Sequence, residues 1–225
     1  MSLLHIPKVS AGQRDRPALA QPVLSEAFAE TAWDAAVLGF VLASLPAGQR
    51  PVLWVQDRLS RKETGGPSLA GMRMTRPLIM VSLSRAADLL WAMEEGLRCQ
   101  ALGAVIGEIW GDPAALDFTA TKRLALRSEA VAVPCWLIRR AASPNLSAAR
   151  DRWRIAACPS AQHPQDALAP GAPRWAVDLF RSRQSKPGAW IATYDRAADR
   201  VDLVAATGDR TLDAADGAAR QRATG

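Results

Sequence analysis

The side chains in this sequence that could do chemistry are carboxylates beside short apolar runs. Glu30 and Asp34 stand four residues apart in the stretch AFAETAWDAA, and Glu108 lies at the end of the apolar run GAVIGEI. A carboxylate at the end of a buried strand can hold Mg²⁺ or its water beside a bound phosphate. Glu94 and Glu95 are adjacent on a predicted helix, so they point about 100° apart and cannot form an acid/base pair on one face.

A nucleotide site also needs groups that bind phosphate, and the sequence lacks the usual set. A phosphate-binding loop uses glycines, whose backbone N–H groups close on the phosphates, together with a lysine and a Ser or Thr hydroxyl. The pattern GxxxxGK[ST] occurs nowhere in the chain. The glycine pair in KETGGPS (62–68) follows the second predicted element, so we interpret it as a surface turn.

Cysteine and histidine provide little material for a metal or redox site. Cys99, Cys135 and Cys158 are widely spaced, and their odd number argues against a disulfide framework or a zinc site. His5 and His163 lie in segments that we expect to be loops. We therefore expect no metal, no cofactor and no catalysis that depends on histidine.

Positive charge is concentrated in one part of the chain. The net charge is +6, and residues 139–190, with nine Lys or Arg and three Asp, also carry +6. Such a region favours a polyanionic partner such as nucleic acid, although a solvated face that aids solubility has the same composition. The candidate residues for binding DNA or a partner are Arg139, Arg140, Arg150, Arg152, Arg154, Arg181, Arg183 and Lys186.

The spacing of these arginines predicts two basic stripes. Arg181 and Arg183 are two residues apart at the end of a predicted strand, so both should project from the same side of a sheet. The alternating residues 150, 152 and 154 give a second stripe. The alternative is that these residues form exposed, weakly coupled ion pairs.

Apolar periodicity predicts an α/β fold over residues 23–205. A helix is expected from near Ser25 to Leu42, on the broad apolar face that includes Ala27 and Phe28. Ser84 is the expected N-cap of a second helix. Buried strands are expected over 51–55, 77–83, 103–109 and 134–138, with helices over 84–99 and 117–131. This alternation predicts a mostly parallel sheet flanked by helices.

The spacing of apolar residues changes in the C-terminal third of the chain. Residues 151–158 and 174–183 alternate at period two, with Trp175, Val177 and Leu179 on one side. The segments GAWIATYD and DRVDLVAAT read as a final hairpin, so this third should extend the sheet with antiparallel strands. A flexible arm is expected over 1–22 and a disordered tail over 206–225.

The tryptophans divide into two groups by their surroundings in the sequence. Those within apolar patterns, Trp91, Trp136, Trp175 and Trp190, are expected in the core. Trp33 and Trp110 are expected to be more exposed, and an exposed indole beside arginines could stack on a base or anchor a protein contact. No apolar run approaches the roughly 20 residues that span a bilayer, and we expect a cytoplasmic, nucleoid-associated protein.

Several combinations of residues resemble the ImuA family of bacteria. They are LLWAMEEGLRCQALGAVIGEIWGD, LDFTATKRLALRSEAVAVPCWLIRR, SAARDRWRIAACPS and RWAVDLFRSRQSKPGAWIATYD. The similarity runs over about residues 24–204. It implies a RecA-like fold and a role in the SOS-induced cassette for mutagenic translesion DNA synthesis. The implied partners are ImuB and, indirectly, an error-prone replicative-type DNA polymerase, with RecA and single-stranded DNA as further candidates.

By the same resemblance, the stretch AFAETAWDAA stands where RecA-like proteins carry the phosphate loop. It offers carboxylates and no cation, so we interpret Glu30, Asp34 and Glu108 as the remnant of a degenerate nucleotide site. The leading hypothesis is a non-catalytic accessory protein. The alternatives are a residual RecA-type ATPase that remodels RecA filaments and a non-specific DNA-binding module.

Overall fold

A computed structural model describes residues 16–66, 68, 76–166 and 168–206 of the chain. Most of the expected N-terminal arm and C-terminal tail lies outside these residues. The helices are α1 (Ala36–Ala43), α2 (Arg58–Thr64), α4 (Ala86–Gly96) and α5 (Phe118–Val131). The strands are β1 (Leu24–Ala29), β2 (Val52–Asp57), β3 (Leu78–Leu83), β4 (Ala104–Trp110), β5 (Cys135–Arg140), β6 (Asp151–Ala157), β7 (Arg174–Ser182), β8 (Gly188–Asp195) and β9 (Arg200–Ala205).

All of these strands belong to one nine-stranded sheet with the order β3-β2-β4-β5-β1-β6-β7-β8-β9. The pairs from β3 to β6 are parallel, and β6 to β9 pair in antiparallel fashion. The mostly parallel α/β sheet with an antiparallel C-terminal extension is therefore confirmed. The predicted final hairpin forms between β8 and β9.

The largest error of the sequence prediction concerns the first element. Residues 24–29 form the central strand β1, and the helix that was expected from Ser25 is confined to Ala36–Ala43. β1 pairs with β5 on one side and with β6 on the other, and five of its six residues are buried. A strand buried on both faces has no period-two signal, so its apolar positions were read as part of a helical face.

Smaller differences concern β3, α2 and the start of α4. β3 was expected to be buried, but it is the edge strand of the sheet and exposes Ile79 and Met80. The N-cap residue of α4 is Arg85, without a side-chain cap, instead of Ser84. Helix α2 was not predicted; its N-cap is Asp57, whose side chain accepts a hydrogen bond from the Ser60 backbone N–H.

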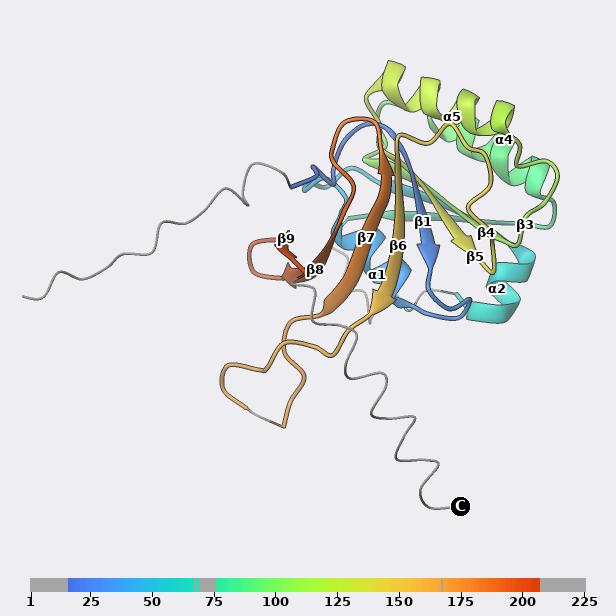
Figure 1. The fold of residues 1–225 in the computed structure, drawn as a ribbon. Coiled ribbons are helices and arrows are strands. Elements are labelled where there is room, and N and C mark those ends of the chain that lie inside the picture. The colour runs from blue at the N-terminus through green and yellow to red at the C-terminus, as the bar shows by residue number, and fades with distance from the viewer. Residues whose placement is uncertain (1–15, 67, 69–75, 167, 207–225) are drawn as a thin grey trace, which may run out of the picture.

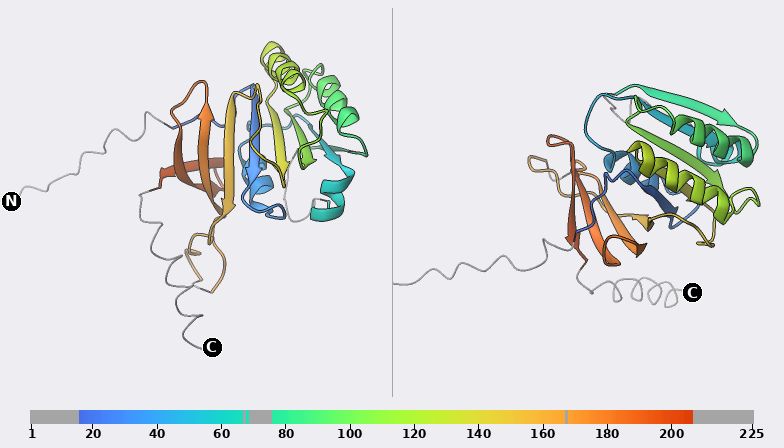
Figure 2. Two further views of the ribbon diagram at one scale, coloured as in Figure 1. Left: turned by 45° about the vertical axis from the view of Figure 1, so that its right-hand side comes forward. Right: turned by 90° about the horizontal axis from the view of Figure 1, so that it is seen from above.

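Helices cover the two faces of the sheet unevenly (Figure 1). α4 and α5 pack together over the part of the sheet that contains β2, β4 and β5, whereas α1 packs against β1 and β6. In the further views of Figure 2, no described helix lies over β7 to β9 on the side that carries α4 and α5. Within the described residues, β7 to β9 therefore have no helix on that face of the sheet.

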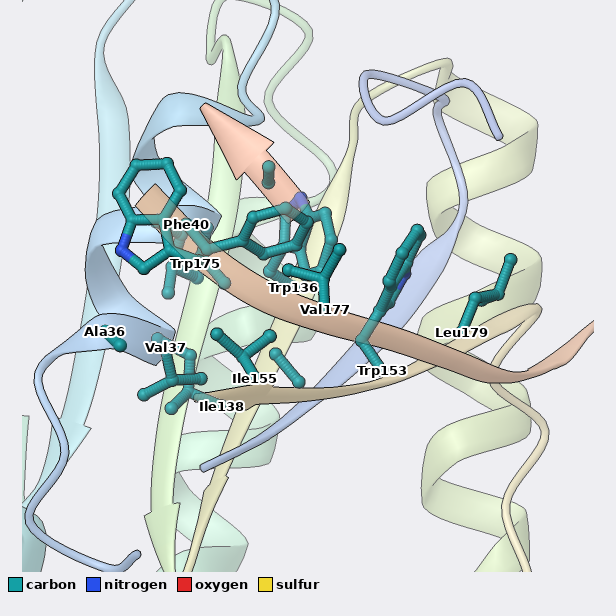
Figure 3. Close-up of a cluster of buried hydrophobic side chains, with 14 of the residues drawn as sticks. Ala36, Val37, Phe40, Trp136, Ile138, Trp153, Ile155, Trp175, Val177 and Leu179 are labelled. Carbon is teal, nitrogen blue, oxygen red and sulfur yellow. The ribbon is translucent and has the colours of Figure 1, made fainter. Parts of the chain in front are cut away.

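An aromatic cluster fills the space under α1 (Figure 3). Phe40 of α1 lies within 6.2 Å, ring centre to ring centre, of Trp136, Trp153 and Trp175. Gly39 permits this approach, since a Cβ atom there would lie 3.1 Å from the Trp175 ring. Three of the four tryptophans expected in the core, Trp136, Trp175 and Trp190, are buried.

Trp91 corrects the fourth of these predictions. Its side chain lies on the outer side of α4 and is 64% exposed, because Leu89, Leu90 and Met93 form the buried side of that helix. No helix within the described ranges is long and apolar enough to cross a membrane.

Candidate functional site

The three candidate carboxylates come from two neighbouring regions at the carboxyl ends of the parallel strands. The loop of residues 30–35 joins β1 to α1, and Glu108 lies near the end of β4. Arg140 ends β5, the strand between β4 and β1. Since the carboxyl ends of parallel strands meet at one edge of a sheet, this is where an open α/β fold places its ligands.

Arg140 fills the centre of this edge. Its side chain is 2% exposed, and its Nε donates a hydrogen bond to the Glu108 carboxylate. Its Nη1 donates to the backbone carbonyl oxygens of Ala32 at 3.0 Å and Asp34 at 2.9 Å. The β1–α1 loop thus turns carbonyl oxygens toward a cation of the protein itself. A phosphate-binding loop has the opposite polarity, because it turns backbone N–H groups toward an anion.

Glu108 is fully engaged inside the protein. Besides Arg140, it accepts a hydrogen bond at 3.1 Å from Nε2 of Gln56, its direct neighbour on β2. Burial raises the pKa of Glu108, and the attraction of Arg140 opposes this rise. The pair and its hydrogen bonds leave neither carboxylate oxygen without a partner, so the side chain is not displayed to an incoming Mg²⁺ ion.

Asp34 and Glu30 have different roles in the loop. Asp34 accepts hydrogen bonds from the backbone N–H of Ala36, in the first turn of α1, at 2.8 Å and from that of Ala157, at the end of β6, at 3.0 Å. It therefore ties the loop to both elements. Glu30 is exposed. The structure does not bring Glu30, Asp34 and Glu108 together as one carboxylate cluster.

The loop also presents an indole to solvent. Trp33 is 63% exposed, and its ring lies 6.0 Å from that of Trp110, which is half-buried at the end of β4. The prediction that these two tryptophans are more exposed than the core tryptophans is confirmed. One member of the pair, Trp33, lies on the loop that Arg140 and Asp34 fix, and the other, Trp110, ends β4.

A second buried charge cluster lies on β1, β5 and β6. Glu26 of β1 accepts a hydrogen bond from Arg152 Nε at 2.7 Å and another from the Ser147 hydroxyl at 2.9 Å. Arg139 approaches the same carboxylate at 3.7 Å and pairs with Asp112 at 2.5 Å. Burial lowers the pKa of Arg139, while Glu26 and Asp112 oppose that shift. The sequence prediction missed Glu26 because its segment was read as a helix.

These contacts correct part of the prediction of a basic binding surface. Arg139, Arg140 and Arg152 are each less than 5% exposed and are paired with internal carboxylates, and Arg139 also pairs with the exposed Asp112. Period-two spacing sets the side of a strand on which a residue lies, but it does not show whether another segment covers that side. In this fold, residues 141–149 pass nearby, and the Pro144 carbonyl accepts a hydrogen bond from Arg152.

The remaining candidates lie at the surface. Arg150 is half-buried and pairs with Glu129, which lowers the pKa of that carboxyl. Arg154 is exposed and pairs with Asp178 at 3.2 Å. The other exposed cations on this part of the chain are Arg181, Arg183 and Lys186. Within the described part of the chain, no three His, Cys, Asp or Glu residues are grouped so that they could hold a metal ion.

Comparison with known proteins relates the chain to one curated protein. No protein-family model matches the chain. Protein ImuA of Caulobacter vibrioides, in two strains, is 33% identical over 157 residues, which are 65% of this chain and 61% of the relative. Over this stretch the chain is similar to ImuA, which confirms the resemblance that the sequence motifs indicated. The match spans less than two thirds of the length of these ImuA proteins.

Proposed function

We propose that this ImuA-like protein is a non-catalytic accessory protein of SOS-induced mutagenic translesion DNA synthesis, built on a RecA-like domain with a degenerate phosphate loop. The relationship to ImuA supports the process. The parallel strands followed by an antiparallel run support the RecA-like domain. The proposed partners are ImuB and, through it, an error-prone replicative-type DNA polymerase, with RecA and single-stranded DNA as further partners.

The buried Arg140 is the observation that carries the non-catalytic part of the proposal. It occupies the space between the β1–α1 loop and Glu108 and takes up two loop carbonyl oxygens. A nucleotide phosphate entering here would have to displace Arg140 and would meet Glu108 as a buried, unpaired carboxylate. Breaking such a pair is strongly unfavourable, and the loop has no lysine or glycine to compensate.

The test is capture of purified ImuB by the purified chain, with and without ATP and Mg²⁺. We expect capture that does not depend on nucleotide. A requirement for ATP would contradict the degenerate site, and absence of capture under both conditions would contradict the partnership. Bound nucleotide should also be absent after equilibrium dialysis with labelled ATP.

Glu108 favours one alternative, a residual RecA-type ATPase that acts on RecA filaments. It retains a carboxylate at the end of a central parallel strand, where Mg²⁺ would be held. This alternative requires that ATP hydrolysis be measurable and that Glu108→Gln abolish it. Hydrolysis that persists at the same rate in Glu108→Gln would point to a contaminating enzyme.

A further inference from the structure

The face of β6 and β7 that lies opposite α1 carries an ordered stack of arginine and phenylalanine side chains. Its exposed part, which we call the open face, is defined by Arg154, Asp178, Phe180 and Arg181, and the buried Arg152 lies beneath it. In the register of the two antiparallel strands, Arg152 stands directly opposite Arg181, and Arg154 stands directly opposite Asp178. Residues opposite each other lie on the same side of the sheet. The opposite side of β6 and β7 packs into the aromatic cluster under α1.

A β-bulge places Phe180 in the stack. The register shifts between Arg152 and Trp153, so that Arg181 and Leu179 face consecutive residues of β6 and Phe180 is left as the extra residue. Bulges redirect side chains and often occur beside functional sites. The Phe180 ring contacts the guanidinium carbon of Arg152 at 5.4 Å and that of Arg154 at 4.3 Å, measured to the ring centre.

The stack runs from the interior to the surface. Arg139 and Arg152 lie over the buried Phe28 ring at 5.5 and 5.2 Å, and the Phe28 ring meets Phe180 edge to face at 5.9 Å. Its outermost member, Arg154, is 48% exposed in its side chain. Asp178 holds one edge of the Arg154 guanidinium, which rests on the Phe180 ring. The result is a flat surface of guanidinium and ring, fixed in orientation on the sheet, in which Asp178 offsets the charge of Arg154.

Further positive charge lies beyond Arg154 and Phe180, toward the carboxyl end of β7. Arg181 is exposed, and no side-chain hydrogen bond or ion pair joins it to another residue that the structure describes. Arg183 and Lys186 follow in the turn between β7 and β8 and are also exposed. Two carboxylates oppose these cations among the described residues, Asp178 on the open face and Glu129, which is attracted to Arg183 as well as to Arg150. The exposed cations Arg154, Arg181, Arg183 and Lys186 outnumber them.

We infer that the open face binds single-stranded nucleic acid, with a base stacked on the Arg154–Phe180 platform and backbone phosphates on Arg181 and Arg183. Unpaired bases stack on aromatic rings and on guanidinium planes, and arginines beside them neutralise the phosphates. A duplex keeps its bases stacked on each other and cannot use the platform. This inference deepens the proposed function, which names single-stranded DNA among the partners, by assigning a surface and a mode of binding to it, and it rests on that function for its biological setting.

The test is fluorescence anisotropy of the full chain with labelled oligo-dT, with oligo-U of the same length and with a duplex of the same length. We expect both single strands to bind more tightly than the duplex. Comparison of oligo-dT with oligo-U shows whether the chain distinguishes DNA from RNA. Arg154→Lys keeps the charge but loses the plane, and Phe180→Leu keeps the apolar bulk but loses the ring. Each should weaken single-strand binding about tenfold and leave its salt dependence unchanged.

Arg181→Gln should instead reduce the slope of log affinity against log salt by about 0.7, the value for one lost phosphate contact on a single strand. Matched controls are Phe118→Leu at the start of α5 and Arg98→Gln just after the end of α4, both exposed and neither on β6 or β7. These controls should bind as the unaltered chain does. Circular dichroism of every variant shows whether it is folded.

Three outcomes would overturn the inference. They are absence of single-strand binding at low salt, equal binding of duplex and single strand, and unchanged binding by both Arg154→Lys and Phe180→Leu. Displacement of the oligonucleotide by a glutamate-rich peptide at equal concentration would assign the face to an acidic protein segment. None of these results affects capture of ImuB, so failure here is distinct from failure of the proposed function.

Discussion

Arg140 and Glu108 form a buried ion pair across the adjacent strands β5 and β4, with side chains that are 2% and 1% exposed. The same guanidinium holds the backbone of the β1–α1 loop. A single side chain therefore joins three elements at the edge of the sheet where nucleotide-binding folds place their ligand.

Replacement of Arg140 should lower the stability of the fold strongly, and replacement of Glu108 in the same chain should restore much of that stability. Arg140→Met leaves Glu108 buried without a counter-charge, with only the hydrogen bond from Gln56 among those described, and we expect a loss of about 3–5 kcal/mol in the free energy of unfolding. The double variant Arg140→Met/Glu108→Leu should be closer in stability to the unaltered chain. Urea unfolding measures both, and a loss below about 1 kcal/mol in the single variant would contradict a buried pair.

Asp34 and Glu30 lie four residues apart in the same loop, and we expect their replacement to have very different effects on stability. Asp34→Ala removes the bonds to the backbone N–H groups of Ala36 and Ala157, and we expect a cost of about 1–2 kcal/mol. Glu30→Ala is the matched control and should change stability by less than about 0.5 kcal/mol. Thermal unfolding of the two variants side by side decides between them. Equal effects would mean that Asp34 does not hold the loop.

The pair formed by Glu129 and Arg150 should make a small contribution that depends on pH. Arg150 lowers the pKa of Glu129 in the folded chain below its ordinary value of 4.5. A depressed carboxyl pKa stabilises the fold above the unfolded pKa, and this contribution is lost as pH falls through the folded pKa. Glu129→Gln should therefore lower stability at pH 7, by at most about 1 kcal/mol for a partly exposed pair.

The same substitution should have no effect well below the folded pKa, where the carboxyl is protonated in both states. Urea titrations of both chains from pH 7 down to pH 3 measure the difference. A gap between the two chains that stays constant over this range would mean that the carboxylate charge is not responsible.

Trp91 and Trp136 test the division between surface and core. Trp136→Ala empties a buried site and should cost about 3–5 kcal/mol. Trp91→Ala, at an exposed position on α4, should cost less than about 1 kcal/mol. Urea unfolding of the two variants gives the comparison. Similar losses would show that the outer side of α4 is covered in solution.

Local patterns in the sequence determined much of the architecture. The strands β2, β4 and β5, the helices α4 and α5 and the antiparallel C-terminal strands follow from apolar runs and periodicity, because each is decided within a few neighbouring residues. The absence of a phosphate-loop pattern and the likeness to ImuA are also properties of the sequence.

The tertiary structure alone decided which charges are inside. Arg152 and Glu26 are 126 positions apart, and Arg140 and Glu108 are 32 apart, yet each pair lies in direct contact. No local pattern distinguishes an arginine that meets a buried carboxylate from one that faces water, because the outcome depends on which strands become neighbours. The place of β1 beside β6 set the pairing of Glu26 with Arg152, and the pairing of β4 with β5 set that of Glu108 with Arg140. Together these neighbours turned three expected surface cations into internal ones.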